Sequence, residues 1–331
     1  MKNPTSPKSS PSRQSPTEKP APVKTAAKKG AAAKAKKPAA EPVILPADDR
    51  FLLGAHMSIA GGPAQAIDRA LSVGCNAMQI FVKNNMQWFA TPFADSELRA
   101  FHEHPHRRAL KSVFGHSGYM INLGATNPEF HDKSLRALSE ELVRADQLEL
   151  PFLVLHPGAH MGEGEEAGLT KITQSLDTVF KSLPEVTTKV ALETTAGQGS
   201  SLGHTFEQLA WIFDRCAYPE RLCVCIDTAH LFAAGYDIST EEGTRQTFEQ
   251  FDNVLGLHRL AAIHCNDSKA ALNSRVDRHD HIGKGKIGVA PFRFIMRDTR
   301  FAAIPKVLET PKGKDLAEDL ENLAVLRSLV V

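Results

Sequence analysis

Eight short apolar runs, rich in β-branched residues and phenylalanine, recur along residues 47–331 and alternate with longer amphipathic stretches. The spacing between the ends of successive runs is about what a strand, a helix and two loops require. Eight repeats of such a unit predict an α/β protein, namely a (β/α)8 or TIM barrel spanning residues 47–331. The runs are Leu52–Ser58, Ala77–Val82, Ser112–Ser117, Phe152–Pro157, Lys189–Thr194, Leu222–Thr228, Ala261–Asn266 and Ile304–Thr310.

The stretches between these runs carry helix signals. Pro63 follows two glycines and opens a stretch whose apolar residues fall on one helical face. Thr205 has the character of an N-cap residue, and Gln208 stands at the position that completes a capping box. Such signals are typical of ordinary helices that pack on a core, so they predict structure rather than a site.

The N-terminal residues have a different composition. Residues 1–42 hold ten Lys or Arg against two Asp or Glu, eight Pro and no aromatic residue, whereas the whole chain carries a net charge of only +1. A segment of this kind buries too little apolar surface to offset the entropy lost on ordering. We therefore expect residues 1–46 to form a disordered tail rich in Lys, Pro and Ala. Its flexible cations could bind a phosphate backbone, and a solubilising or targeting role explains them equally well.

The sequence also limits the compartment. It has no run of eighteen apolar residues, which argues against a transmembrane helix, and no apolar stretch near the N-terminus of the kind that marks a secretory signal. The five cysteines are an odd number and include no CxxC pair. This usage favours a reduced intracellular compartment, with the thiols acting as small buried apolar groups.

The residues that carry chemistry gather where the apolar runs end. In a parallel barrel the carboxyl ends of all strands open onto one rim, so side chains that follow the strands converge there. Almost every run ends in a strongly polar or metal-binding residue. These residues are His56, Lys83, His116, His156, Glu193, Asp227, His264 and Glu309.

Three further candidates lie just past strands on the same rim. His230 follows Asp227 by three residues, and Asp277 and His279 are two residues apart in a polar, glycine-rich loop. Spacing by two puts both side chains on one side of an extended segment, where they can bind one ion. Any one of these histidines taken alone fits an ordinary buried or surface residue equally well. Their convergence with the other residues of the rim predicts a site.

The charge of this set argues for bound metal. Four carboxylates in one pocket would repel one another strongly without cations. Five neutral imidazoles add nitrogen ligands, which favour zinc over magnesium or calcium. Nine ligands exceed the needs of one tetrahedral ion and suit two or three, which would leave a positive pocket suited to a phosphate group. The carboxylates are Glu193, Asp227, Asp277 and Glu309, and the imidazoles are His116, His156, His230, His264 and His279.

Several segments match a known family both in sequence and in order. They closely resemble endonuclease IV, the zinc-dependent apurinic/apyrimidinic endonucleases of DNA base-excision repair, and the resemblance extends over residues 50–331. The segments are HMSIAGG (56–62), HPGAH (156–160), LETTAGQGS (192–200), CIDTAHLFAAGYD (225–237), IHCNDSK (263–269), SRVDRHDHIGKGKIG (274–288) and VLET (307–310).

The resemblance implies a TIM barrel with three zinc ions per chain, manganese being an alternative at some positions. Glu193 would bridge two of the ions and position the hydroxide that acts as nucleophile. The implied ligand sets are His116, His156 and Glu193 for the first ion, Glu193, Asp227, His264 and Glu309 for the second, and His230, Asp277 and His279 for the third.

The resemblance also implies an activity. A zinc-activated hydroxide would attack the phosphodiester 5′ to an abasic site in double-stranded DNA, leaving a 3′-hydroxyl and a 5′-deoxyribose phosphate. The same site would trim blocked 3′ ends. Such an enzyme would be cytoplasmic and associated with the nucleoid in a bacterium, or nuclear in a eukaryote. We expect a monomer without a membrane partner.

Rim loops supply the candidate DNA contacts. Members of the family insert loop side chains into the base stack and turn the abasic nucleotide out of the helix. The family's first loop reads Asn-Gln-Arg-Gln-Trp, whereas this chain has Asn85 and Met86 before Gln87, so the wedge at this position lacks a charge. His56 is on the rim but outside the implied ligand set, and we expect it to support a ligand or touch substrate. The candidate DNA contacts are Met86, Gln87, Trp88, Tyr119, Met120, Lys269, Arg275 and Arg278, with Lys284 and Lys286 nearby.

Two other functions stay open. A sugar isomerase or epimerase would use metal-binding acids and histidines on the same rim, but it would hold one or two ions and have less need for His230, Asp277 and His279. A DNA-binding barrel without catalysis would leave the ligand set without a purpose. Incision of an abasic duplex without formation of a ketose separates the nuclease from both alternatives.

Overall fold

The structure is a computed structural model, and it describes residues 44–45 and 50–330. The expected tail, residues 1–46, lies almost entirely outside the described residues, so its disorder and the boundary at residue 47 stay predictions. Among the described helices, none combines the length and the apolar content that a membrane crossing requires.

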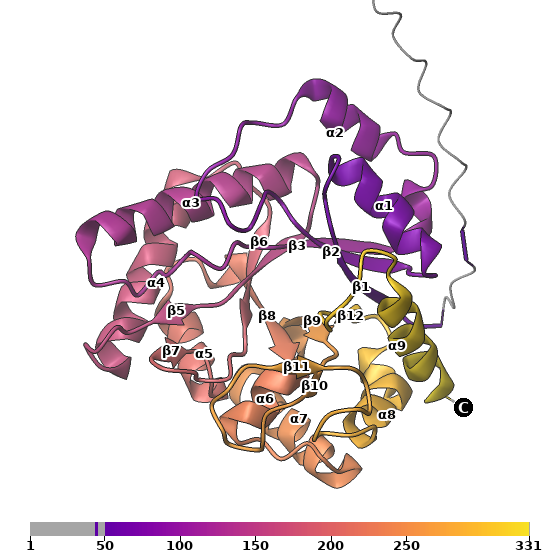
Figure 1. Ribbon diagram of the computed structural model, residues 1–331. Coiled ribbons are helices and arrows are strands. Elements are labelled where there is room, and N and C mark those ends of the chain that lie inside the picture. Colours follow the sequence, from indigo (N-terminus) through magenta and orange to yellow (C-terminus); the bar gives the residue numbers. More distant parts are fainter. Residues whose placement is uncertain (1–43, 46–49, 331) are drawn as a thin grey trace, which may run out of the picture. The chain divides into compact units, whose positions relative to one another are not determined.

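Eight parallel strands close into a barrel, and helices surround it (Figure 1). Each apolar run identified in the sequence overlaps one strand, so the predicted α/β barrel is confirmed. The first strand pairs with both the second and the last, which closes the barrel. The order around the barrel is β1 (Leu53–Met57), β12 (Lys306–Leu308), β9 (Leu260–His264), β8 (Leu222–Asp227), β6 (Lys189–Glu193), β4 (Phe152–Leu155), β3 (Ser112–His116) and β2 (Ala77–Phe81).

The helices follow the strands, and four short strands form two antiparallel pairs in the loops at the carboxyl rim. These pairs are β5 (Gly158–Ala159) with β7 (Ser201–Leu202), and β10 (Asp267–Ser268) with β11 (His279–Asp280). The helices are α1 (Pro63–Ser72), α2 (Asp95–His102), α3 (Pro128–Gln147), α4 (Glu165–Ser182), α5 (Phe206–Arg215), α6 (Thr228–Ala234), α7 (Glu241–Leu255), α8 (Ala290–Arg297) and α9 (Ala317–Ser328).

The start of α5 differs from the predicted capping box in one respect. Thr205 is the N-cap as expected, and its hydroxyl accepts a hydrogen bond from Gln208 N at 3.2 Å. The Gln208 side chain, however, accepts from Gly203 N at 2.7 Å and His204 N at 3.1 Å. The predicted return bond to the N-cap is therefore wrong, because Gln208 instead satisfies the backbone of the turn before the helix.

The alternation of side chains along the strands determines which strand-end residues face the barrel interior. In β6, Val190 and Leu192 pack outward toward the helices, while Ala191 belongs to a small cluster inside the barrel. The next inward position is Glu193, since strand side chains alternate with a period of two. The same alternation in the other strands directs Gln79, His116, His156, Asp227, His264 and Glu309 inward.

Aromatic and small side chains fill the barrel below this rim. The rings of Phe114 and Phe152 stack with centroids 4.7 Å apart, and Cys223 and Cys225 lie in the same interior cluster. All five cysteines are free and buried, as their pattern in the sequence predicted. The polar residues of the rim therefore lie on a packed apolar floor, which holds their side chains in place and keeps water out from below.

A buried lysine at the opposite end of the barrel gives a stability prediction. Lys306 is 1% exposed, its ammonium donates to Phe301 O and Ile304 O, and burial lowers its pKa from 10.5 to about 8. Between these two pH values the unfolded chain holds a proton that the folded chain has lost, so the contribution of Lys306 to stability rises with pH.

We compare the free energy of unfolding of the wild type with that of Lys306→Met. The difference between them should increase by up to about 3 kcal/mol from pH 8 to pH 10.5, the range between the two pKa values of Lys306. Urea denaturation of both proteins across this range measures the difference, which isolates Lys306 from all other titrating groups. A difference that does not change with pH would contradict the assignment.

Candidate metal centre

The inward-facing residues at the strand ends gather at the carboxyl rim of the barrel. Eight of the nine residues proposed from the sequence fall into three clusters, and the potential ligand atoms within each cluster lie within 4.8 Å of one another. Glu193 belongs to two clusters, and so does Asp227. The clusters are His116, His156 and Glu193; Glu193, Asp227, His264 and Glu309; and Asp227, His230 and His279.

Glu193 joins the first two clusters through its two carboxylate oxygens. Oε2 lies 3.2 Å from His116 Nε2 and 2.9 Å from His156 Nε2, whereas Oε1 lies 3.0 Å from His264 Nδ1. His264 Nδ1 is in turn 3.1 Å from Glu309 Oε2. One oxygen of Glu193 thus faces each cluster, which is the arrangement expected of a carboxylate that bridges two cations.

The ninth residue, Asp277, reaches the third cluster from the loop that precedes β11. Its Oδ2 is 3.1 Å from His230 Nε2, and its Oδ1 is 3.3 Å from His279 Nε2. Its side chain is 40% exposed, which makes it the most open member of the centre. Asp227 Oδ2 lies 3.6 Å from His279 Nε2, so the geometry adds Asp227 to the set expected from the sequence for the third ion.

In the metal-free chain the buried carboxylates and imidazoles compensate one another's charge. Burial by itself would raise the pKa of Glu193, but the imidazoles of His156 and His264 hold that pKa well below its ordinary value. Burial would lower the pKa of His264 and of His230, yet nearby anionic groups hold both well above the usual range. The carboxylates are thus negatively charged and the imidazoles positively charged, and each stabilises the other. A bound cation would take the place of the protons on the imidazoles.

The donor set fits bound divalent cations. His279 Nε2 is buried and makes no hydrogen bond with any described residue, although it lies between the carboxylates of Asp227 and Asp277. A buried ring nitrogen without a hydrogen bond is costly unless an ion binds it. The mixture of imidazole nitrogens and carboxylate oxygens is typical of zinc and similar transition ions. The three clusters are therefore consistent with a multi-metal site.

Gln79 and Asn266 support this centre and were missed in the sequence. Gln79 donates to Glu309 Oε1 at 2.6 Å, and its amide oxygen lies 2.7 Å from His264 Nε2. Asn266 donates to Asp227 Oδ2 at 2.6 Å and accepts from Glu309 N at 2.8 Å. Such partners orient ligands. Gln79 could have been found from the inward alternation of β2, because it is the polar residue that follows Ala77 on the interior face.

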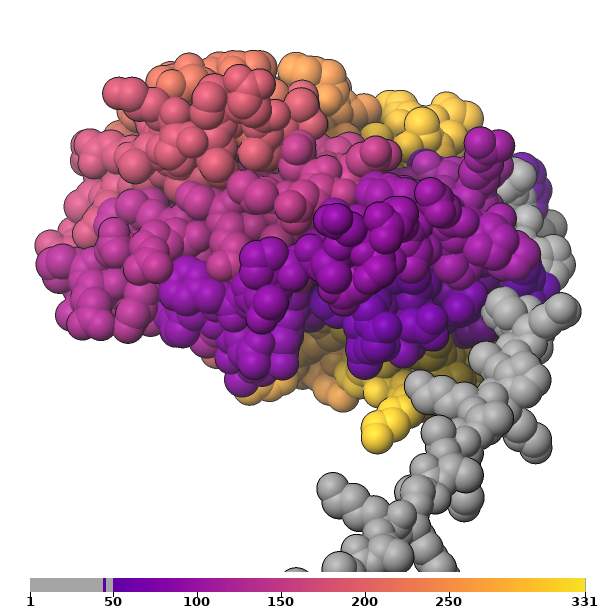
Figure 2. Space-filling view, turned by 90° about the horizontal axis from the view of Figure 1, so that it is seen from above, coloured from indigo at the N-terminus to yellow at the C-terminus, as the bar shows by residue number. Residues whose placement is uncertain are grey.

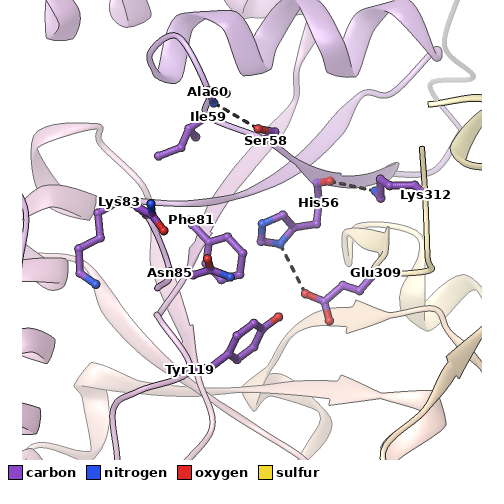
Figure 3. A pocket seen from close by; sticks show the side chains of 11 residues that line it. His56, Ser58, Ile59, Ala60, Phe81, Lys83, Asn85, Tyr119, Glu309 and Lys312 are labelled. Atoms are coloured by element: carbon purple, nitrogen blue, oxygen red, sulfur yellow. Dashed lines mark hydrogen bonds and ion pairs between the residues drawn. The ribbon is translucent and has the colours of Figure 1, made fainter. Parts of the chain in front are cut away.

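Lys83 lies on the rim but does not join the carboxylate–imidazole clusters. Its side chain turns away from His56 and Glu309 (Figure 3) and forms a buried ion pair with Glu141 of α3 at 2.8 Å. Lys83 thus lies on the rim and lines the same pocket as His56 and Glu309, but its ammonium pairs with Glu141 and not with the carboxylates of the clusters.

His56 contacts Glu309, one of the proposed ligands. Its Nδ1 is 3.5 Å from Glu309 Oε1 and 2.8 Å from Gln79 Nε2, and burial lowers its pKa to about 4. It therefore stays neutral at physiological pH. Figure 3 shows it directed at Glu309 in a pocket of about 630 Å³ that also includes Tyr119 and Lys312. The pocket opens beside the metal centre and leaves room for part of a substrate.

The candidate DNA contacts surround the centre on exposed loops. Met86 is 75% exposed and Tyr119 is 58% exposed, and the Tyr119 ring lies 5.5 Å from the His116 ring. Trp88 is half-buried and packs edge-on against Phe130 of α3, with ring centroids 5.1 Å apart.

The other candidates differ in exposure. Gln87 is exposed, whereas Met120 and Arg275 are half-buried. Lys269 and Arg278 are both exposed and lie side by side, because Lys269 N donates to Arg278 O at 2.9 Å. All of these residues belong to loops at the carboxyl rim, on the side of the barrel that carries the metal centre.

Comparisons with known proteins agree with this geometry. Residues 67–329 match the family model described as a xylose isomerase-like TIM barrel. Probable endonuclease 4 of Geobacter sulfurreducens is 50% identical over 278 residues, which cover 84% of this chain and 94% of the relative. Probable endonuclease 4 of Chloroflexus aurantiacus is likewise 50% identical, over 84% of this chain and 97% of its own.

A solved structure supports the same relationship. The crystal structure of endonuclease IV from Thermus thermophilus superposes with a TM-score of 0.74 and 33% identity, covering 84% of this chain and 98% of that one. The match at half identity, over nearly the full length of curated relatives, goes well beyond a shared barrel. The chain with this three-cluster centre belongs to the endonuclease IV family.

Proposed function

We propose that the chain is a DNA-repair endonuclease that cleaves the phosphodiester 5′ to an abasic site in double-stranded DNA. The products are a 3′-hydroxyl and a 5′-deoxyribose phosphate, and the same centre removes blocking groups from 3′ ends. One observation carries the proposal: three carboxylate–imidazole clusters, joined by Glu193 and Asp227, lie at a rim that also presents the exposed Met86 and Tyr119.

The donor set favours zinc, three ions per chain, with manganese an alternative at some positions. Such ions, when bound, supply a water of lowered pKa as nucleophile and neutralise the charge on the phosphate. The nine residues that would hold them are His116, His156, Glu193, Asp227, His230, His264, Asp277, His279 and Glu309.

The chain's own side chains fix the geometry of the reaction. Glu193 directs one oxygen to each of two clusters and would hold the ions that supply the nucleophile. Asp227 connects the second cluster to the third, where His230 and Asp277 would hold the ion that neutralises charge on the phosphate. His56 and Gln79 hold Glu309 in place from the side of the 630 Å³ pocket.

The rim loops recognise the damaged site. Met86, Tyr119 and the neighbouring Met120 are placed to enter the base stack where a base is missing, since unstacking costs least at such a site. Lys269 and Arg278 project from the β10–β11 loops and are positioned to contact backbone phosphates. Gln87, Trp88 and Arg275 complete the surface that the DNA would cover.

An incision assay tests this function. The full chain, supplied with zinc, is incubated with an end-labelled duplex that contains one abasic site, and the product is offered to a DNA polymerase. We expect a single cut and an extendable 3′ end. Absence of incision, or conversion of a ketose by the same preparation, would refute the proposal. The barrel also superposes on a D-tagatose 3-epimerase-like protein with a TM-score of 0.63, but at 16% identity this likeness shows the fold alone.

The basic tail gives a second prediction. Residues 1–42 carry ten cationic residues and lie outside the described residues. If they contact DNA, deleting them lowers the affinity and flattens its salt dependence, because each phosphate contact contributes about 0.9 to the slope of log affinity against log salt. Single-turnover cleavage at saturating protein should be unchanged. A full-length control with these cations replaced by glutamine separates charge from chain length, and equal slopes for all three proteins would exclude the tail as a DNA contact.

The compartment follows from the substrate. The matched relatives come from bacteria, so we place the enzyme in the cytoplasm with the nucleoid. A nuclear location would apply only if the host is a eukaryote, where the basic tail could act as a targeting signal.

A further inference from the structure

Helix α3 holds both ends of the loop that carries Met86. Arg144 donates to Val82 O at 2.8 Å and to Thr91 O at 2.9 Å, at the two ends of this segment. Ala90 N donates to Glu140 on the same helix at 2.8 Å. In the space-filling view the violet residues that follow β2 and the magenta residues of α3 form one continuous surface (Figure 2).

The centre of the loop is held from below by the Lys83–Glu141 ion pair. The pair is almost fully buried, with side-chain exposures of 2% and 1% and a separation of 2.8 Å. The Lys83 ammonium also donates to Gln87 O, the residue directly after Met86. The tip itself is free, because Met86 is 75% exposed. The base of the loop is therefore fixed, while the side chain at its tip projects into solvent.

The same ion pair reaches the second rim loop. Glu141 Oε2 accepts a hydrogen bond from Gly118 N at 2.9 Å, directly before Tyr119. The two loops also touch, since a Cβ atom at Gly118 would lie 3.3 Å from each of Asn85 O, Lys83 Nζ and Glu141 Oε1. A Cβ at position 118 would therefore make contacts tighter than usual, and these neighbours would have to move by a few tenths of an ångström. The ion pair thus lies at the junction of the two loops that carry the exposed wedge residues.

A buried ion pair is weak support for stability, because apolar residues of similar volume often do as well. A role in fixing the geometry of the loops explains this pair better, because its polar atoms also form hydrogen bonds with backbone groups of two different loops, at Gln87 O and Gly118 N. We propose that Lys83, Glu141 and Arg144 are positioning residues for abasic-site recognition. They hold Met86 and Tyr119 at a fixed spacing above the metal centre. This inference rests on the proposed endonuclease function.

The test compares two DNA substrates. In the first, the abasic site lies in a fully stacked duplex; in the second, mismatched pairs flank it, so that the stack is already open and less insertion is needed. The measured quantity is the ratio of kcat/KM on the stacked duplex to kcat/KM on the open one. Because both substrates report the same active protein, loss of folded enzyme cancels from the ratio.

The variant is the double substitution Lys83→Met with Glu141→Gln. It removes the charges and the contact to Gln87 O, keeps the volume, and leaves an amide oxygen that still accepts from Gly118 N. We expect the ratio to fall on the order of tenfold to a hundredfold, as for other misplacements of about one ångström. The matched control, Glu249→Gln, breaks an exposed ion pair with Arg245 on α7 and should keep the wild-type ratio.

A second measurement asks whether the pair acts through Met86. Met86→Ala should lower the ratio in the wild-type background and cause little further loss in the double variant, because coupled residues are non-additive. An unchanged ratio in the double variant, an equal loss on both substrates, or equal effects of Met86→Ala in both backgrounds would overturn the proposal. If the wild type cuts neither substrate, the proposed function itself fails.

Discussion

Glu193→Gln is expected to lower incision of an abasic duplex by on the order of a thousandfold while the barrel stays folded. Glu193 is fully buried and directs one carboxylate oxygen to His156 and the other to His264. An amide keeps the shape but replaces one oxygen with a donor group that cannot bind a cation. The variant therefore loses the link between the first two clusters, along with the position of the nucleophile.

Single-turnover incision measures the loss of activity, and far-UV circular dichroism shows whether the barrel stays folded. Asp298→Asn is the matched control, because it makes the same chemical change in a carboxylate that pairs with Arg300 near the opposite end of the barrel. We expect the control to cut at the wild-type rate. Near-normal cleavage by Glu193→Gln would show that Glu193 does not have the role assigned to it.

Removal of metal should abolish incision and reduce stability together. Glu193 and Asp227 are fully buried, and Glu309 nearly so, in a centre that metal ions would neutralise. A cation that binds only the folded chain stabilises it by about 4 kcal/mol when its free concentration is a thousandfold above the dissociation constant. The chelated protein should therefore melt at a lower temperature and show no activity.

Differential scanning calorimetry and the incision assay, before and after chelation and again after addition of zinc, measure both effects. Restoration of activity and melting temperature by zinc is the expected result. Magnesium in place of zinc serves as the control, since the first and third clusters each offer two imidazole nitrogens, which bind it poorly. Full activity after chelation would contradict the metal centre.

The sequence predicted the barrel and the proposed ligands, but not all of the contacts that the ligands make. Apolar runs with a regular spacing identify strands, and the rule that parallel strands open onto one rim was enough to bring His116, Glu193 and Glu309 together. The structure describes all nine proposed ligands at one rim, and a single alternation rule explains the six that end or directly follow strands of the barrel. The monomeric state stays a prediction.

Other features depend on contacts that no local pattern reveals. The position of Lys83 on the rim follows from the sequence, but its partner Glu141 comes from the middle of α3, fifty-eight positions later in the chain. Asp227 joins the third cluster because the loop that carries His279 folds back over the end of β8, which spacing alone does not indicate. Gln208 satisfies the preceding turn in preference to its own helix end. In each case a long-range or loop contact overrides the local signal.

The most direct test is a crystal of the full chain grown with zinc, with diffraction recorded on both sides of the zinc absorption edge. We expect three anomalous peaks within ligand distance of the nine residues, with Glu193 and Asp227 each touching two of them. Peaks outside the barrel rim, or an empty rim with these side chains pointing apart, would contradict it.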